Sequence, residues 1–225
     1  MNQNASPGRR RRARTNDEIS EATRRKLLVA GRRLFASRGY ADVSADQIAD
    51  RAGLTRGALH YQFSDKRGLF EAVVRQLLGE LAERVYRETM SQVEEGPDEL
   101  LRGCEVLLAA YGEPEIQTIA LRDAPVVLGF TTWRVVQDEA GLTALLVHAL
   151  GHWVEAGWIE SARVEPLARL LFGALTQAGV AVGEPKDPKE RALALARYRE
   201  EVKHLVHGLM PPRASRTRSA TKETR

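Results

Sequence analysis

The fold of this chain is decided by residues 44–66, which read SADQIADRAGLTRGALHYQFSDK. Ser44 can cap a first helix, and Gln47, three residues later, can reach back to complete a capping box. Gly53 suits the end of that helix, because the position after a helix often takes a left-handed backbone that glycine adopts at little cost. This stretch therefore predicts a short helix that ends in a glycine turn.

A second short helix follows the turn. Thr55 can cap it, and Leu59 and Phe63 are apolar anchors at helical spacing. Residues 54–64 contain no Asp or Glu, although a solvated helix usually mixes acids with bases. Two such helices form a helix-turn-helix, the unit that lays its second helix in the major groove of DNA.

The distribution of charge gives a second, independent indication of nucleic acid. Residues 1–67 carry 15 Lys and Arg against 7 Asp and Glu, whereas residues 68–212 carry 14 against 22. Residues 213–225 are basic again, with 5 against 1. A basic module joined to an acidic body suits a protein that meets phosphates at one end only.

Length and composition exclude several classes of protein. A chain of 225 residues with 43% hydrophobic content suits a soluble globular protein with one moderate domain and a smaller one. Its apolar runs, such as 144–150 and 170–175, are shorter than the ~20 residues that span a bilayer. Residues 1–14 lack the apolar core of a signal peptide, and Cys104 is the single cysteine, which excludes an intramolecular disulfide. We expect a cytoplasmic protein.

The whole chain predicts an all-α protein with two domains. Residues 15–66 form a three-helix helix-turn-helix DNA-binding domain, and residues 67–210 form a helical body, to which the family resemblance described below assigns effector binding and dimerisation. A first helix ends at Arg38. A long helix joins the two domains; it starts at Ser64 and Asp65 and runs to about Met90. Further helices are expected over residues 96–111, 114–122, 125–137, 142–156, 166–182 and 187–206. The basic ends, 1–14 and 211–225, are predicted to be disordered; the first is either a solubilising tail or an arm that follows the DNA.

Four short motifs stand out between residues 27 and 74: Leu34-Phe35-Ala36, Arg38-Gly39-Tyr40, Ala52-Gly53-Leu54 and Gly57-Ala58-Leu59-His60-Tyr61. In type and spacing they resemble the TetR family of bacterial transcription repressors. His60 departs from the family, which very often has tyrosine there, and further on only the helix count and residues 122–129 are similar. The resemblance implies a homodimer whose N-terminal modules bind DNA. It also implies that a small-molecule effector enters the C-terminal body and changes the spacing of the recognition helices.

The predicted DNA contacts divide into anchors and readers. Ser44 and Thr55 stand at helix starts, where free N–H groups attract a phosphate. Arg56 can take N7 and O6 of guanine together, and Gln62 can pair bidentately with adenine. The resemblance places His60 and Lys66 on the phosphate backbone. The full set is Ser44, Thr55, Arg56, Gly57, Ala58, His60, Tyr61, Gln62 and Lys66.

The effector site and the dimer interface are predicted on the apolar helices of the body. Candidate effector residues are Leu101, Cys104, Leu108, Tyr111, Gln117, Arg122, Phe130, Trp133, Arg134 and His152, each with a core or surface role as the alternative. Candidate interface residues are Leu142, Leu145, Leu146, Ala149, Trp153, Leu167, Leu171, Ala174, Leu175 and Ala178, with burial inside one subunit as the alternative. A two-fold axis would make the operator a palindrome.

No cofactor or metal ion is predicted. His148 and His152 are four residues apart, but no carboxylate or cysteine at a confirming spacing accompanies them. Cys104 is expected in the core, with a thiol sensor as the alternative. Two other functions remain open: a sequence-neutral architectural DNA-binding protein, and an α-helical enzyme with a vestigial helix-turn-helix, which no nucleophile–base motif or Gly-rich phosphate loop supports.

Overall fold

A computed structural model describes residues 15–93 and 96–210, so the basic ends predicted to be disordered, 1–14 and 211–225, lie outside the described residues. The described residues form helices and no strand, which confirms the predicted all-α class. In chain order the elements are α1 (Asn16–Arg38), α2 (Ala45–Ala52), α3 (Arg56–Phe63), α4 (Lys66–Met90), α5 (Glu99–Tyr111), α6 (Pro114–Ile116), the π-helix η1 (Gln117–Asp123), α7 (Ala124–Leu128), α8 (Phe130–Glu139), α9 (Leu142–Glu155), the 3₁₀-helix η2 (Ser161–Arg163), α10 (Val164–Gly183) and α11 (Pro188–Leu209).

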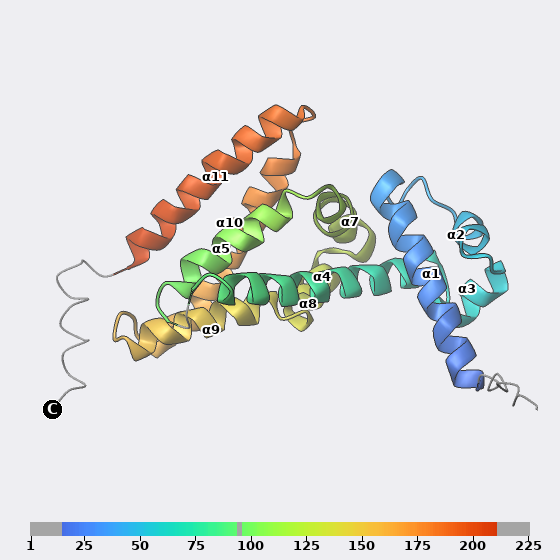
Figure 1. The fold of residues 1–225 in the computed structure, drawn as a ribbon, viewed down its shortest axis with the longest axis horizontal. Coiled ribbons are helices and arrows are strands. Elements are labelled where there is room, and N and C mark those ends of the chain that lie inside the picture. Colours follow the sequence, from blue (N-terminus) through green and yellow to red (C-terminus); the bar gives the residue numbers. More distant parts are fainter. Residues whose placement is uncertain (1–14, 94–95, 211–225) are drawn as a thin grey trace, which may run out of the picture.

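The helices gather in two groups that α4 connects (Figure 1). Helices α1, α2 and α3 cluster at one end, and α4 runs from this cluster into the body, where α5, α9, α10 and α11 lie. One side of α4 is buried along its whole length, with Leu69 and Phe70 near its start and Leu81 and Val85 near its end. A single apolar core therefore extends from the helix-turn-helix into the body.

The local signals of residues 44–66 act as the sequence predicts. Ser44 and Gln47 form both hydrogen bonds of the capping box at the start of α2. Gly53 ends α2 in the left-handed conformation, with φ 66°. The Thr55 hydroxyl accepts the N–H of Ala58, at 3.2 Å, and so caps α3. These helix ends are set by neighbouring residues in the chain, which explains why the sequence alone predicts them.

The prediction of one helix over 114–122 and another from Pro125 is wrong. The chain stays helical through α6, η1 and α7 and breaks at Gly129, where φ is 83°. Proline has no N–H and normally interrupts an α-helix. Here the N–H of Ala124 reaches five residues back to the carbonyl of Ile119, and this wider turn accommodates Pro125 within the helix.

One helical stretch, Ser161–Gly183, is long and apolar enough to cross a membrane by length and composition. The sequence did not predict this, because its unbroken apolar runs are short. Within the protein, α10 packs against α5, α9 and α11 and buries Leu171 and Leu175 in the core. It thus occupies the position of a core helix of a folded body.

Candidate nucleic-acid interface and effector clefts

Helix α3 has one buried face and one open face. Leu59 and Phe63 are buried in the shared core, whereas Arg56, Gly57, His60 and Tyr61 are exposed, Tyr61 to 84%. Ala58 is half-buried beside them. The open face therefore combines a guanidinium, an aromatic hydroxyl and an imidazole with two small residues that permit close approach to a groove.

Two exposed side chains of this face, Arg56 and His60, have neighbours in the free protein. Arg56 Nη1 lies 3.2 Å from Asp46 Oδ2 of α2, and both side chains are largely exposed. An exposed pair of this kind contributes little to stability and is easily exchanged for another partner. The Nδ1 atom of His60 lies against the carbonyl oxygen of Ser64, so Nε2 is the ring nitrogen that does not face Ser64. Ser44 and Thr55 are exposed at the starts of α2 and α3.

Gln62, predicted to read a base, has partners within the chain. Its amide nitrogen donates to the hydroxyl of Ser20 at 2.9 Å and to the Ser20 carbonyl at 3.4 Å, both on α1. The backbone carbonyl of Gln62 accepts a hydrogen bond from Arg24, whose guanidinium also covers the Phe63 ring. Gln62 therefore holds α3 against α1 in this arrangement, with its amide nitrogen bound to Ser20.

Lys66, a predicted phosphate contact, also has partners within the chain. Its ammonium donates to the carbonyls of Tyr40 at 3.1 Å and Val43 at 2.8 Å, and lies 3.9 Å from the centre of the Tyr40 ring. Partial burial lowers the pKa of Lys66 and raises the pKa of Tyr40. Lys66 thus ties the loop between α1 and α2 to the start of α4, which a purely phosphate-binding lysine would not do.

Polar contacts connect the helix-turn-helix to the body at three points. Arg32 of α1 forms a bidentate pair with Glu115 of α6, at 2.8 and 2.9 Å, and a third bond to Glu80 of α4. The backbone N–H of Tyr40 donates to Asp123, at the end of η1, at 2.7 Å. Arg67 of α4 donates to the last carbonyls of α7. The middle helices of the body are therefore in direct contact with the DNA-reading end.

A cleft of about 490 Å³ opens between η1, α7, α8, α9 and α10. It contains three of the predicted effector residues, Phe130, Trp133 and Arg134. Gln137 lines it as well. The amide nitrogen of Gln137 and the indole nitrogen of Trp133 are buried without a hydrogen-bond partner among the described residues. Sequence reasoning missed Gln137 and the α10 wall of this cleft, which is formed by Arg169, Phe172, Gly173, Thr176, Gln177 and Val180.

A second cleft of about 360 Å³ adjoins the first and shares Leu121 and Val180 with it. Two predicted effector residues, Gln117 and Arg122, line this second cleft. The amide nitrogen of Gln117 donates to the carbonyls of Tyr111 and Gly179, which fastens η1 to α5 and α10. Gln117 therefore positions the cleft wall in addition to lining it.

The remaining predicted effector residues line neither cleft. Cys104, Leu108 and Tyr111 are fully buried in the core, and Leu101 packs against it. Burial raises the pKa of the Cys104 thiol to about 12 and raises the pKa of Tyr111, so both groups are protonated at neutral pH. A protonated, buried thiol is a poor sensor. His152 lies elsewhere, beside Glu99 at the start of α5.

Most of the predicted dimer-interface residues are buried within the chain itself. Helices α9 and α10 pack against each other, and the buried residues are Leu142, Leu146, Ala149, Trp153, Leu171, Leu175 and Ala178. Leu145 and Leu167 are partly buried against the same core, and Ala174 is exposed. Exposed apolar side chains occur instead on the outer faces of α10 and α11, at Leu170, Leu193 and Leu205.

A three-helix module whose third helix, α3, has no acid and one exposed face, mounted on a helical body with clefts, is the architecture of a helix-turn-helix DNA-binding protein. Two family models match the chain: "Bacterial regulatory proteins, tetR family" over residues 27–73 and "Tetracyclin repressor-like, C-terminal domain" over residues 97–209. The crystal structure of a TetR-family transcriptional regulator from Pectobacterium atrosepticum is 34% identical, with a TM-score of 0.75, and covers 89% of this chain and 100% of that chain. The chain belongs to the TetR family, as its sequence predicts.

Curated relatives match over shorter stretches. The HTH-type transcriptional regulator TtgR from Pseudomonas putida is 34% identical over 100 residues, which are 44% of this chain and 46% of that protein. The HTH-type transcriptional repressor AcnR from Corynebacterium diphtheriae is 34% identical over 79 residues, 35% of this chain and 41% of that protein. The matched stretches thus cover less than half the length of these relatives.

Replacing Lys66 by Met tests its structural role, because methionine keeps the length of the side chain and removes its charge and donors. We expect the free energy of unfolding to fall by about 1–2 kcal/mol, since two loop carbonyls lose a charged donor. Arg56→Ala, an exposed change nearby, is the control and should alter stability by less than ~0.5 kcal/mol. Urea unfolding followed by circular dichroism measures both; an unchanged Lys66→Met variant would contradict the role.

Proposed function

We propose that this chain is a homodimeric, cytoplasmic transcriptional repressor that binds a palindromic operator and is released by a small-molecule effector. The observation that carries the proposal is the open face of α3, where Arg56 and Tyr61 are exposed on a helix without acids. Leu59 and Phe63 anchor the opposite face in the core, so the helix can be presented rigidly. Family membership supports the repressor class.

Within this proposal, Arg56 reads a base and Tyr61 touches a base or a phosphate. Ser44, Thr55 and His60 anchor the phosphate backbone, and Gly57 and Ala58 let the helix approach the groove floor. Lys66 adds to phosphate affinity only through the part of its ammonium group that does not donate to the carbonyls of Tyr40 and Val43. Gln62 can contact adenine only if its amide nitrogen leaves Ser20, so this proposal assigns base reading first to Arg56.

Arg56→Ala is expected to weaken operator binding by ~1–3 kcal/mol and to relax the preference at one position of each half-site, because a bidentate base contact is lost. Binding selections from random DNA, followed by footprinting, measure both effects. Arg197→Ala is the matched control, since it removes the same charge from an exposed position on α11. An unchanged base preference in Arg56→Ala would refute the assignment.

The same footprint of the parent protein separates the other function classes. Uniform coverage of DNA would indicate an architectural protein, and an absence of binding at low salt would indicate an enzyme.

For the dimer we propose an interface on the outer faces of α10 and α11. Leu170 is 70% exposed on α10, and Leu193 and Leu205 are exposed on α11. Helices α10 and α11 pack side by side within the chain, so two copies can form a four-helix bundle across a two-fold axis. This proposal replaces the residues on α9 and the inner face of α10, which the core of one chain already buries.

Leu170→Glu is expected to give a monomer by light scattering, because it places a carboxylate at the centre of an apolar contact. Operator affinity should fall by more than about tenfold, since two linked half-sites no longer bind together. Val126→Glu introduces the same charge at a residue of α7 that is 82% exposed, and should leave the dimer intact. A Leu170→Glu variant that remains dimeric would place the interface elsewhere.

For the effector we propose the 490 Å³ cleft and an apolar, aromatic molecule that carries oxygen acceptors. Phe130, Trp133 and Phe172 supply apolar surface, and the unpartnered nitrogens of Trp133 and Gln137 supply donors. A buried donor without a partner is costly, and a ligand oxygen would remove that cost. Leu121 of η1 lines the cleft, and Asp123 of η1 holds the Tyr40 loop, so η1 connects the two.

Asp123→Ala tests this connection. We expect an effector found by thermal-shift screening to bind the variant with unchanged affinity, because Asp123 does not line the cleft. The loss of operator affinity that the effector causes should shrink by about fivefold or more, since an allosteric effect reflects a coupling free energy between sites. Asp98→Ala, an exposed acid at the start of α5, is the control. Full release in Asp123→Ala would exclude η1 as the connection.

A further inference from the structure

The start of α5 and the last half of α9 bring a carboxylate and two imidazoles together. Glu99 Oε2 lies 3.2 Å from His152 Nε2, and Glu99 Oε1 lies 3.8 Å from His148 Nε2. One ligand atom from each of the three side chains falls within 4.8 Å of the others. The two histidines are on one face of α9, and Glu99 comes from 49 positions earlier in the chain than His148.

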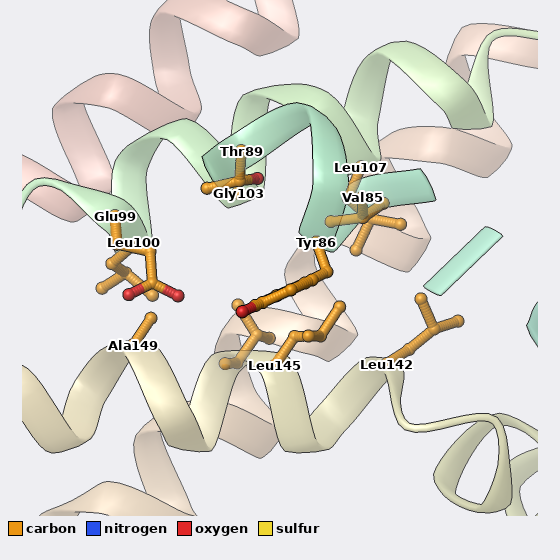
Figure 2. Close-up of a pocket in the computed structure, with 11 residues that line it drawn as sticks. Val85, Tyr86, Thr89, Glu99, Leu100, Gly103, Leu107, Leu142, Leu145 and Ala149 are labelled. Carbon is orange, nitrogen blue, oxygen red and sulfur yellow. The ribbon is translucent and has the colours of Figure 1, made fainter. Parts of the chain in front are cut away.

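The burial of Glu99 requires an explanation. The residue is only 5% exposed, and its Oε2 atom has no hydrogen-bond partner among the described residues. His152 Nε2 is likewise buried and without a hydrogen bond, although it lies 3.2 Å from that oxygen. Figure 2 shows the Glu99 carboxylate directed from α5 toward α9, beside Ala149. A buried carboxylate is costly unless it is paired or coordinates a metal ion.

The three donors have the spacing of metal ligands. A tetrahedral zinc ion with bonds of about 2.0–2.1 Å separates its ligand atoms by about 3.3–3.4 Å. The distances of 3.8 Å to Glu99 Oε1 and 3.2 Å to Glu99 Oε2 lie on either side of this value, and one ligand atom from each residue lies within 4.8 Å of the others. Two histidines and one carboxylate are a known zinc-ligand set that leaves a fourth position for water. We propose that Glu99, His148 and His152 bind one divalent transition-metal ion of the zinc type, which clamps α5 to α9.

The surroundings hold these side chains in place without the ion. The Nδ1 atom of His152 lies 3.1 Å from Glu155 Oε2, the carboxylate–imidazole contact that orients metal-binding histidines. The indole N–H of Trp153 donates to the carbonyl of Pro97 at 2.8 Å and so fixes the chain two residues before Glu99. His148 is 47% exposed, which gives an ion a path from solvent. The metal site is therefore largely formed in advance, with an open entry.

The test is a titration of the full-length, tag-free protein with Zn²⁺ after chelator treatment, followed by calorimetry. We expect one ion per chain, and an affinity that falls by more than about tenfold in Glu99→Gln and in His148→Ala. The second variant changes a half-exposed residue, so it should fold even if the buried change does not. Co²⁺ in place of Zn²⁺ should give the intense visible absorption of four-coordinate cobalt.

His204→Ala combined with His207→Ala is the matched control, because it removes two exposed histidines from α11 and should leave binding unchanged. Absence of saturable Zn²⁺ binding would overturn the proposal, as would undiminished binding in both site variants. The titration contains neither DNA nor effector. Its failure would therefore leave the proposed operator binding untouched, and a failure of operator binding would leave the metal site untouched.

Discussion

Burial of one face of α4 along its whole length is the constraint on which the rest of the structure depends. Near its start, Leu69 and Phe70 complete the core of the three N-terminal helices; near its end, Leu81 and Val85 lie in the core of the body. Because both groups of helices pack on one rigid element, the position of α3 is defined relative to the clefts. A change in the body can therefore reach the DNA-reading end without unfolding either group.

The contacts that set this relation are of two kinds. Apolar packing along α4 is dense and has few alternatives. The contacts from Arg32 to Glu80 and Glu115, and from Tyr40 to Asp123, are directional hydrogen bonds and ion pairs. Their location at α6 and η1, next to the clefts, supports the proposal that effector binding acts through them. The π-helical turn before Pro125 belongs to the same segment.

Much of the DNA-reading module could be predicted from the sequence, because its decisive interactions are local. The capping box of Ser44 and Gln47, the left-handed Gly53 and the Thr55 cap each involve residues within a few positions of one another. The sequence did not predict the distant partners that two side chains of this module have within the chain. Gln62 binds Ser20 of α1, and Lys66 binds the Tyr40–Val43 loop, so two predicted DNA contacts have structural roles that residue type does not indicate.

The sequence by itself determined the all-α class, the helix-turn-helix, the long connecting helix and the family. Periodicity, helix caps and motif spacing depend only on residues that are close together in the chain. Only the tertiary structure decided which apolar residues of α9 and α10 are core, which side chains of α8 and α10 meet at a cleft, and that Glu99 stands against His148 and His152. Such sites join residues from separate helices, and their assembly depends on how those helices pack.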